Sequence, residues 1–116
     1  MIICKQGVQF TKFRTETLKL MTVADACYKA FGCTCRITCG TDGHSLTDPH
    51  TNGYAIDMGT HELPEEKKQP ILKAIQEAAG PDYYIFLEAQ GTDNEHFHGQ
   101  TRIGLWQERM KAEDGL

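Results

Sequence analysis

The stretch YYIFLEAQGTDNEHFHGQTRI, residues 83–103, indicates the fold class. Its first part, residues 83–88, is aromatic and aliphatic and is typical of a strand. Residues 96–103 predict a second strand, and the turn-rich segment AQGTDN at 89–94 separates the two. A connection this short brings consecutive strands together as an antiparallel hairpin. We therefore expect an α+β domain with a central, mainly antiparallel sheet.

Working outward from this hairpin, the pattern predicts two further strands and two helices. CTCRITC at 33–39 alternates in the manner of a strand, and YAIDM at 54–58 is a second short strand. Apolar residues recur at three- and four-residue spacing over 15–31 and 64–80, which predicts helices. The tail at 106–116 is compatible with a short helix.

Length and composition restrict the classes of protein. A chain of 116 residues predicts one domain, residues 1–116, and 40% hydrophobic with 24% charged residues is typical of a globular protein. Twelve Lys and Arg against sixteen Asp and Glu give a net charge of −4, which argues against a nucleic-acid partner. Because no apolar run approaches the roughly 20 residues of a membrane span, we expect no membrane partner. The start MIICKQGVQFTKF lacks the apolar stretch of a signal peptide, so we expect cytoplasmic synthesis.

A candidate site begins in the strand at 54–58. Alternation places Asp57 and the small Ala55 on the face away from the core. Gly53 permits a turn that would bring His50 back over this strand.

The last predicted strand places two histidines on its face away from the core. His96 and His98 share one side of this strand, whereas Phe97 points to the core. Two strands therefore present metal-binding side chains on a face away from the core. One Asp with two His is a ligand set that zinc accepts, with the fourth position left for a water whose pKa zinc lowers to about 7.

Hydrolysis at such a site needs a base. Glu95 stands three residues before His98, in a Glu-x-x-His spacing, although strict alternation would place it on the face of Phe97. Glu88, at the end of the preceding strand, is the competing candidate. His96 could donate a hydrogen bond to a developing oxyanion.

The cysteines suggest a different chemistry. Without a signal peptide we expect reduced thiols at Cys4, Cys27, Cys33, Cys35 and Cys39. Three of them could bind a metal or form a redox site, but C-x-C-x3-C matches no paired zinc signature. Alternation places Cys33, Cys35 and Cys39 with Ile37 on one strand face, which predicts small buried hydrophobic residues instead. His44 and His61 fit no ligand pattern, and we expect them at the surface.

The segment ITCGTDGHSLTDPHTNGYAIDM at 37–58, followed by LE and then NEHFHGQ, resembles the zinc D-Ala-D-Ala metallopeptidase superfamily. That superfamily includes the vancomycin-resistance D,D-carboxypeptidases and dipeptidases, phage L-alanyl-D-glutamate endolysins and hedgehog-type domains. Its pattern is Ser-x-His-x-x-Gly-x-Ala-x-Asp, followed by a distal His. The resemblance spans roughly residues 10–100 of the chain.

The resemblance implies a single Zn²⁺ ion held by His50, Asp57 and His98, with Glu95 as the base. It also implies helices packed on one side of the sheet and a zinc site in a groove. Arg36 is the candidate for the arginine that steadies the substrate, and Asp48 stands where the family has serine. A second departure is Gly99-Gln100, where the family has an acidic residue after the distal histidine.

The function implied is hydrolysis of peptide bonds in bacterial peptidoglycan, of the D,D-carboxypeptidase or L-Ala-D-Glu endopeptidase type. We expect a monomer that acts as a phage lysis protein at the cell wall. Two alternatives stay open: a zinc-stabilised, non-catalytic binding module of the same fold, and a thiol-based redox or metal-sensing domain.

Overall fold

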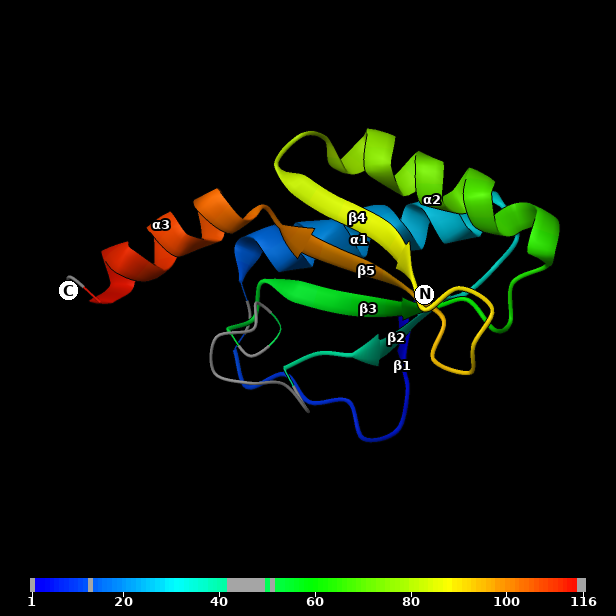
Figure 1. Cartoon of the computed structure of the whole chain (residues 1–116), viewed down its shortest axis with the longest axis horizontal. Helices are drawn as coiled ribbons and strands as arrows, with labels where there is room; N and C mark the ends of the chain where they lie inside the picture. The colour runs from blue at the N-terminus through cyan, green and yellow to red at the C-terminus, as the bar shows by residue number, and fades with distance from the viewer. Residues whose placement is uncertain (1, 13, 42–49, 51, 115–116) are drawn as a thin grey trace.

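Three helices and five strands make up the protein (Figure 1). The computed structural model describes residues 2–12, 14–41, 50 and 52–114. Along the chain the elements are β1 (Ile2–Cys4), α1 (Thr15–Ala30), β2 (Cys35–Cys39), β3 (Ala55–Gly59), α2 (Glu65–Ala79), β4 (Tyr83–Glu88), β5 (His96–Thr101) and α3 (Ile103–Asp114). The predicted single α+β domain is confirmed.

The five strands form one open sheet in the order β1-β2-β3-β5-β4. The pairs β2–β3, β3–β5 and β4–β5 are antiparallel, and β1 pairs with β2 in parallel. The predicted hairpin is therefore present, with Tyr83 opposite Thr101 and Glu88 opposite His96. The sequence did not predict β1, because a strand of three residues is too short to show a periodic pattern. Its parallel pairing makes the sheet mixed.

Helices α1 and α2 cover one face of this sheet, and Figure 1 shows α1 behind the strands and α2 along the side of β4. The hydrophobic core joins the inner sides of the two helices to alternate strand residues; its fully buried members include Leu20, Tyr28, Ile37, Ile56, Met58, Ile71, Ile75 and Phe97. Because strand side chains alternate between faces, the neighbours of these strand residues lie on the opposite face. That opposite face carries the candidate site.

Helix α3 starts directly after β5 and extends away from the sheet (Figure 1). Trp106 anchors it, since its ring stacks on Tyr54 with centroids 5.9 Å apart. The sequence placed the end of the strand at 103 and a possible helix at 106, so the change from strand to helix comes earlier than predicted. Among the helices described, none is both long and apolar enough to cross a lipid bilayer.

Candidate metal centre

A row of four side chains crosses the face of the sheet that is opposite α1 and α2. Strand pairing places Cys39 opposite Asp57, Asp57 opposite His98, and His98 opposite Phe86. Directly opposed residues on neighbouring strands point to the same face, with their Cβ atoms about 5 Å apart. The pairing register therefore assembles a thiol, a carboxylate and an imidazole from three strands.

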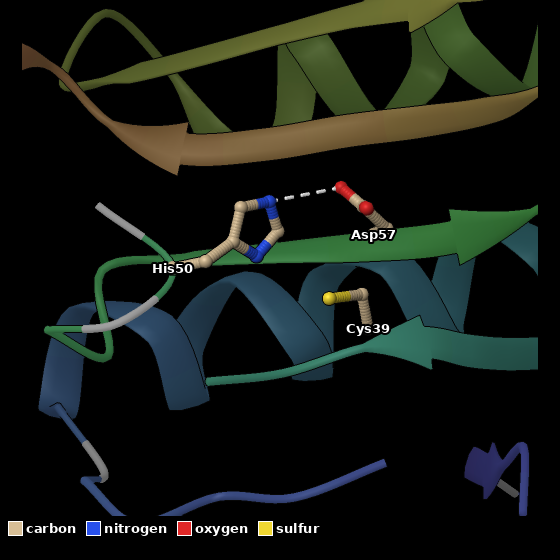
Figure 2. Close-up of side chains that lie close together, drawn as sticks. All are labelled: Cys39, His50 and Asp57. Atoms are coloured by element: carbon tan, nitrogen blue, oxygen red, sulfur yellow. Dashed lines mark ion pairs between the residues drawn. The ribbon is translucent and has the colours of Figure 1, made fainter. Parts of the chain in front are cut away.

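The position of Cys39 corrects the sequence prediction. Simple alternation placed this cysteine on the buried face with Cys35 and Ile37. The register of the β2–β3 pair shifts between Ile37 and Cys39, so β2 has one residue more than β3 at this point. An extra residue in one strand reverses the face of every side chain that follows it. The Cys39 side chain consequently lies beside Asp57 (Figure 2).

A tight turn brings His50 to the same place. The Gly53 backbone N–H donates to the carbonyl oxygen of His50 at 3.0 Å, and Gly53 has φ of 81°, in the left-handed region. A Cβ at Gly53 would lie 2.7 Å from the carbonyl oxygen of Lys12. The predicted Gly53 turn is thus confirmed, and His50 is only 2% exposed. Figure 2 shows the His50 ring reaching along β3 toward Asp57.

Three ligand atoms converge where these side chains meet. His50 Nε2 lies 3.1 Å from Asp57 Oδ1, and His98 Nδ1 lies 3.2 Å from the same oxygen. The two ring nitrogens are 3.1 Å apart. Cys39, His50 and Asp57 likewise place their ligand atoms within 4.8 Å of one another, and this group could hold a metal ion.

The outer nitrogens of both imidazoles are hydrogen-bonded to oxygens. His50 Nδ1 donates to the Gly40 carbonyl at 3.0 Å, and His98 Nε2 donates to Gln100 Oε1 at 2.7 Å. A neutral imidazole that donates from one nitrogen presents a lone pair on the other. Both inner nitrogens therefore point lone pairs at the Asp57 carboxylate, and this arrangement requires a shared proton or a cation between them.

The pKa shifts of Asp57 and His98 agree with a proton or a cation between the carboxylate and the rings. Burial alone would raise the pKa of Asp57, but hydrogen bonds with His50 and His98 outweigh it and hold that pKa below its ordinary value. Burial lowers the pKa of His98, and contacts with Asp57 and Gln100 raise it, with a net upward shift. Both shifts favour an ion pair of Asp57 with His98.

The predicted base Glu95 has three hydrogen bonds of its own. Its carboxylate accepts from Thr60 Oγ1, from Lys68 Nζ at 2.8 Å and from the Gly91 N–H at 3.1 Å. These bonds, with the one from Lys68 contributing most, lower the pKa of Glu95 to about 2. Glu95 borders the same cavity as the ligand cluster, but its three partners connect it to α2, to the loop before β5 and to the residue directly after β3.

Glu88 and His96 lie closer to the ligand cluster. His96 Nε2 is 2.9 Å from Glu88 Oε2 and 3.5 Å from Asp57 Oδ2, and His96 Nδ1 donates to the Asn94 carbonyl at 2.6 Å. The Glu88 side chain is 50% exposed. The competing base candidate is therefore accessible and linked through His96 to Asp57. Both base assignments stay predictions.

The predicted substrate-binding residue Arg36 lies apart from this cluster. Arg36 pairs its Nη2 with Glu62 Oε1 at 3.0 Å and borders a neighbouring cavity of about 360 Å³. That cavity shares Lys5, Thr38 and His61 with the one above the ligand cluster. Asp48 lies outside the described residues, as does His44. The roles of Arg36 and Asp48 stay predictions.

An open cavity of about 510 Å³ lies over the ligand cluster. Its wall includes His61, which is exposed as predicted and pairs its Nε2 with the Asp93 carbonyl at 2.9 Å. Lys5, directly after β1, also borders the cavity. Neither residue belongs to the site predicted from the sequence, because both reach it only through the tertiary arrangement.

Comparisons of the chain with protein-family models, with curated proteins and with solved structures found no match. The resemblance to the zinc metallopeptidases consequently rests on the residue pattern alone. The candidate metal centre rests on the geometry of the described residues.

Proposed function

We propose that this protein is a zinc-dependent peptidase that cleaves peptides of the bacterial cell wall. The observation that carries the proposal is the convergence of His50 Nε2, Asp57 Oδ1 and His98 Nδ1, each 3.1–3.2 Å from the other two. Tetrahedral zinc with bonds of about 2.0–2.1 Å to nitrogen and oxygen holds such atoms about 3.3–3.4 Å apart. The donor set therefore fits this ion with a movement of a few tenths of an ångström.

The surroundings of the donors also favour a metal. Histidines that bind metals almost always donate their other N–H to an oxygen, which fixes the ring and its tautomer. Gly40 and Gln100 accept such bonds from His50 and His98. Gln100, which departs from the family pattern, thus still orients the distal histidine.

His50, Asp57 and His98 would hold the zinc, which when bound would supply Lewis-acid polarisation of the scissile carbonyl. The remaining steps fall to the side chains along the cavity wall. Among these, we assign the general base to Glu88 rather than to Glu95. A base needs a carboxylate that can accept a proton from the attacking water. Glu88 is half-exposed, whereas Glu95 already accepts three hydrogen bonds, which lower its pKa to about 2.

We assign His96 to the substrate oxygen. The Asn94 carbonyl accepts from His96 Nδ1 and holds the ring beside Glu88, whose Oε2 accepts from Nε2 at 2.9 Å. The Nε2–H would turn from Glu88 to the substrate oxygen as negative charge develops there. The choice of cell-wall peptides as substrate rests on the motif from Asp48 to Asp57 with the distal His98.

A zinc-stabilised binding module is the second candidate function. Structural zinc sites are closed by four protein ligands, whereas catalytic sites keep one position open. Cys39, within 4.8 Å of the His50 and Asp57 ligand atoms, is the observation that favours this alternative.

Mass spectrometry of peptidoglycan fragments incubated with the protein separates the two functions. Each reaction is run with added zinc and with chelator, and H98A is the matched inactive variant. Chelator-sensitive release of D-Ala would identify a carboxypeptidase, and cleavage after L-Ala an endopeptidase. Unchanged fragments in the presence of stoichiometrically bound zinc would refute the peptidase and support the binding module.

A further inference from the structure

We propose that Cys39, as a thiolate, is a fourth protein ligand of the metal ion. This inference rests on the metal site of the proposed function, and it changes the nature of that site. With four protein ligands the resting protein holds its metal in a closed site, and a water can reach the ion only after the thiolate leaves.

The first support is the shifted register of β2. Strand β2 has one residue more than β3 between Ile37 and Cys39. The cysteine therefore faces the ligand cluster and not the hydrophobic core. Without the shift, Cys39 would lie on the same face as Ile37, which is fully buried under the helices. β-Bulges often re-aim a single side chain next to a functional site.

The second support is the position of the sulfur. Cys39 lies directly opposite Asp57 on the neighbouring strand, and its ligand atom is within 4.8 Å of those of His50 and Asp57. Figure 2 shows the three side chains on one side of the sheet, with the Cys39 sulfur and the Asp57 carboxylate on the side of His50. Zinc with bonds of about 2.3 Å to sulfur and about 2.0–2.1 Å to nitrogen and oxygen holds these atoms about 3.6 Å apart, so the group must contract by about 1 Å to bind it.

The third support is the Gly40 carbonyl, which contacts both Cys39 and His50. The Gly40 carbonyl accepts the Nδ1–H of His50 at 3.0 Å and also faces Cys39 Sγ at 3.8 Å. The thiol therefore lies beside the group that fixes the tautomer of a neighbouring ligand. A cation at the site would favour the thiolate over the thiol, because a coordinating thiol loses its proton.

Cys33, just before β2, and Cys35, within β2, have different surroundings from Cys39. Cys35 is fully buried in the core, and burial raises its pKa to about 12, which keeps it a thiol. Cys33 is half-buried, as Cys39 is, but its Sγ faces the Phe31 carbonyl at 3.5 Å. Cys33 is thus a matched control for Cys39: similar exposure on the same segment, without the ligand cluster.

Cobalt substitution tests the proposal directly. The full chain, C39S and C33S are loaded with Co²⁺ and their absorption spectra are recorded, because a cobalt–thiolate bond adds a near-ultraviolet charge-transfer band that nitrogen and oxygen ligands lack. We expect the band in the parent and in C33S and its loss in C39S. Substitutions that only disturb groups around a ligand cost about 10–100-fold in metal affinity, so C39S should bind zinc at least about tenfold more weakly.

The outcomes separate this inference from the proposed function. Stoichiometric cobalt without the charge-transfer band in the parent would overturn the Cys39 ligand and leave the three-ligand metal site in place. A band that persists in C39S would also overturn it. If neither cobalt nor zinc binds to the parent, the metal site and the Cys39 ligand both fail.

Discussion

Asp57 lies directly opposite His98 across the β3–β5 pair, and its Oδ1 is 3.2 Å from Nδ1 of that histidine. The two residues are 41 positions apart in the chain, so the strand register alone brings them together. On the other face of the same strands, Ile56, Met58 and Phe97 are fully buried under the helices. The site is therefore built on strands whose register the core specifies, and its geometry is preorganised.

D57N should abolish tight zinc binding. The amide keeps the size of the side chain but removes the charge and leaves a poor ligand between two imidazoles. We expect the zinc dissociation constant, measured by competition with a chromophoric chelator, to rise by at least about tenfold. D93N is the matched control, since Asp93 borders the same cavity without belonging to the ligand cluster. Unchanged zinc binding in D57N would contradict the site.

Zinc should stabilise the folded protein through the same cluster. A ligand that binds only the folded state at 100 times its dissociation constant adds about 2.7 kcal/mol to the free energy of unfolding. Urea unfolding with excess zinc and with chelator measures this difference. H98A should lose most of it, because one of the three convergent donors is gone. Equal stabilisation of H98A and the parent would place the zinc elsewhere on the protein.

The two glutamates should differ in their effects on hydrolysis. If Glu88 is the base, E88Q should lower kcat by about 10²–10⁴-fold with zinc still bound. E95Q should retain most of the activity, because its carboxylate is already engaged with Lys68, Thr60 and Gly91. Steady-state kinetics and zinc content are measured on both variants. The reverse ranking would restore Glu95 as the base.

Glu95 should instead contribute to stability in a pH-dependent way. Its folded-state pKa of about 2 is below the ordinary value of 4.5, so its contribution is fully present above pH 4.5. That contribution is lost as the pH falls from 4.5 toward 2, because the carboxylate must then be protonated. Urea unfolding at pH 7 and pH 3 should show E95Q less stable than the parent at pH 7, with a smaller difference at pH 3. A constant difference would argue against the ionised Lys68 contact.

The sequence predicted much of this site because strands have a period of two. Alternation alone placed Asp57 and His98 away from the core, and Gly53 signalled the turn that carries His50. Alternation failed at Cys39, because nothing in CTCRITC marks the residue at which the β2–β3 register shifts. The hydrogen bonds of Glu95 with Lys68 and Thr60 were equally invisible, since these partners are 27 and 35 residues away in the chain. Local pattern predicts which face a side chain takes only where the strand register is regular, whereas the partners on that face depend on tertiary packing.

Replacing Gly53 should lower both the stability of the protein and its zinc affinity. G53A forces an alanine into φ of 81° and brings its Cβ to 2.7 Å from the Lys12 carbonyl oxygen, so the turn must shift. A non-glycine residue in this region costs about 1–3 kcal/mol, and the shift also displaces His50 from Asp57. G32A is the matched control, because Gly32 has φ of 72° and a Cβ there would meet nothing within 4 Å. Both variants should lose stability in urea unfolding, but only G53A should also lose zinc affinity. Equal zinc affinity in the two variants would show that the Gly53 turn does not position His50 for the metal.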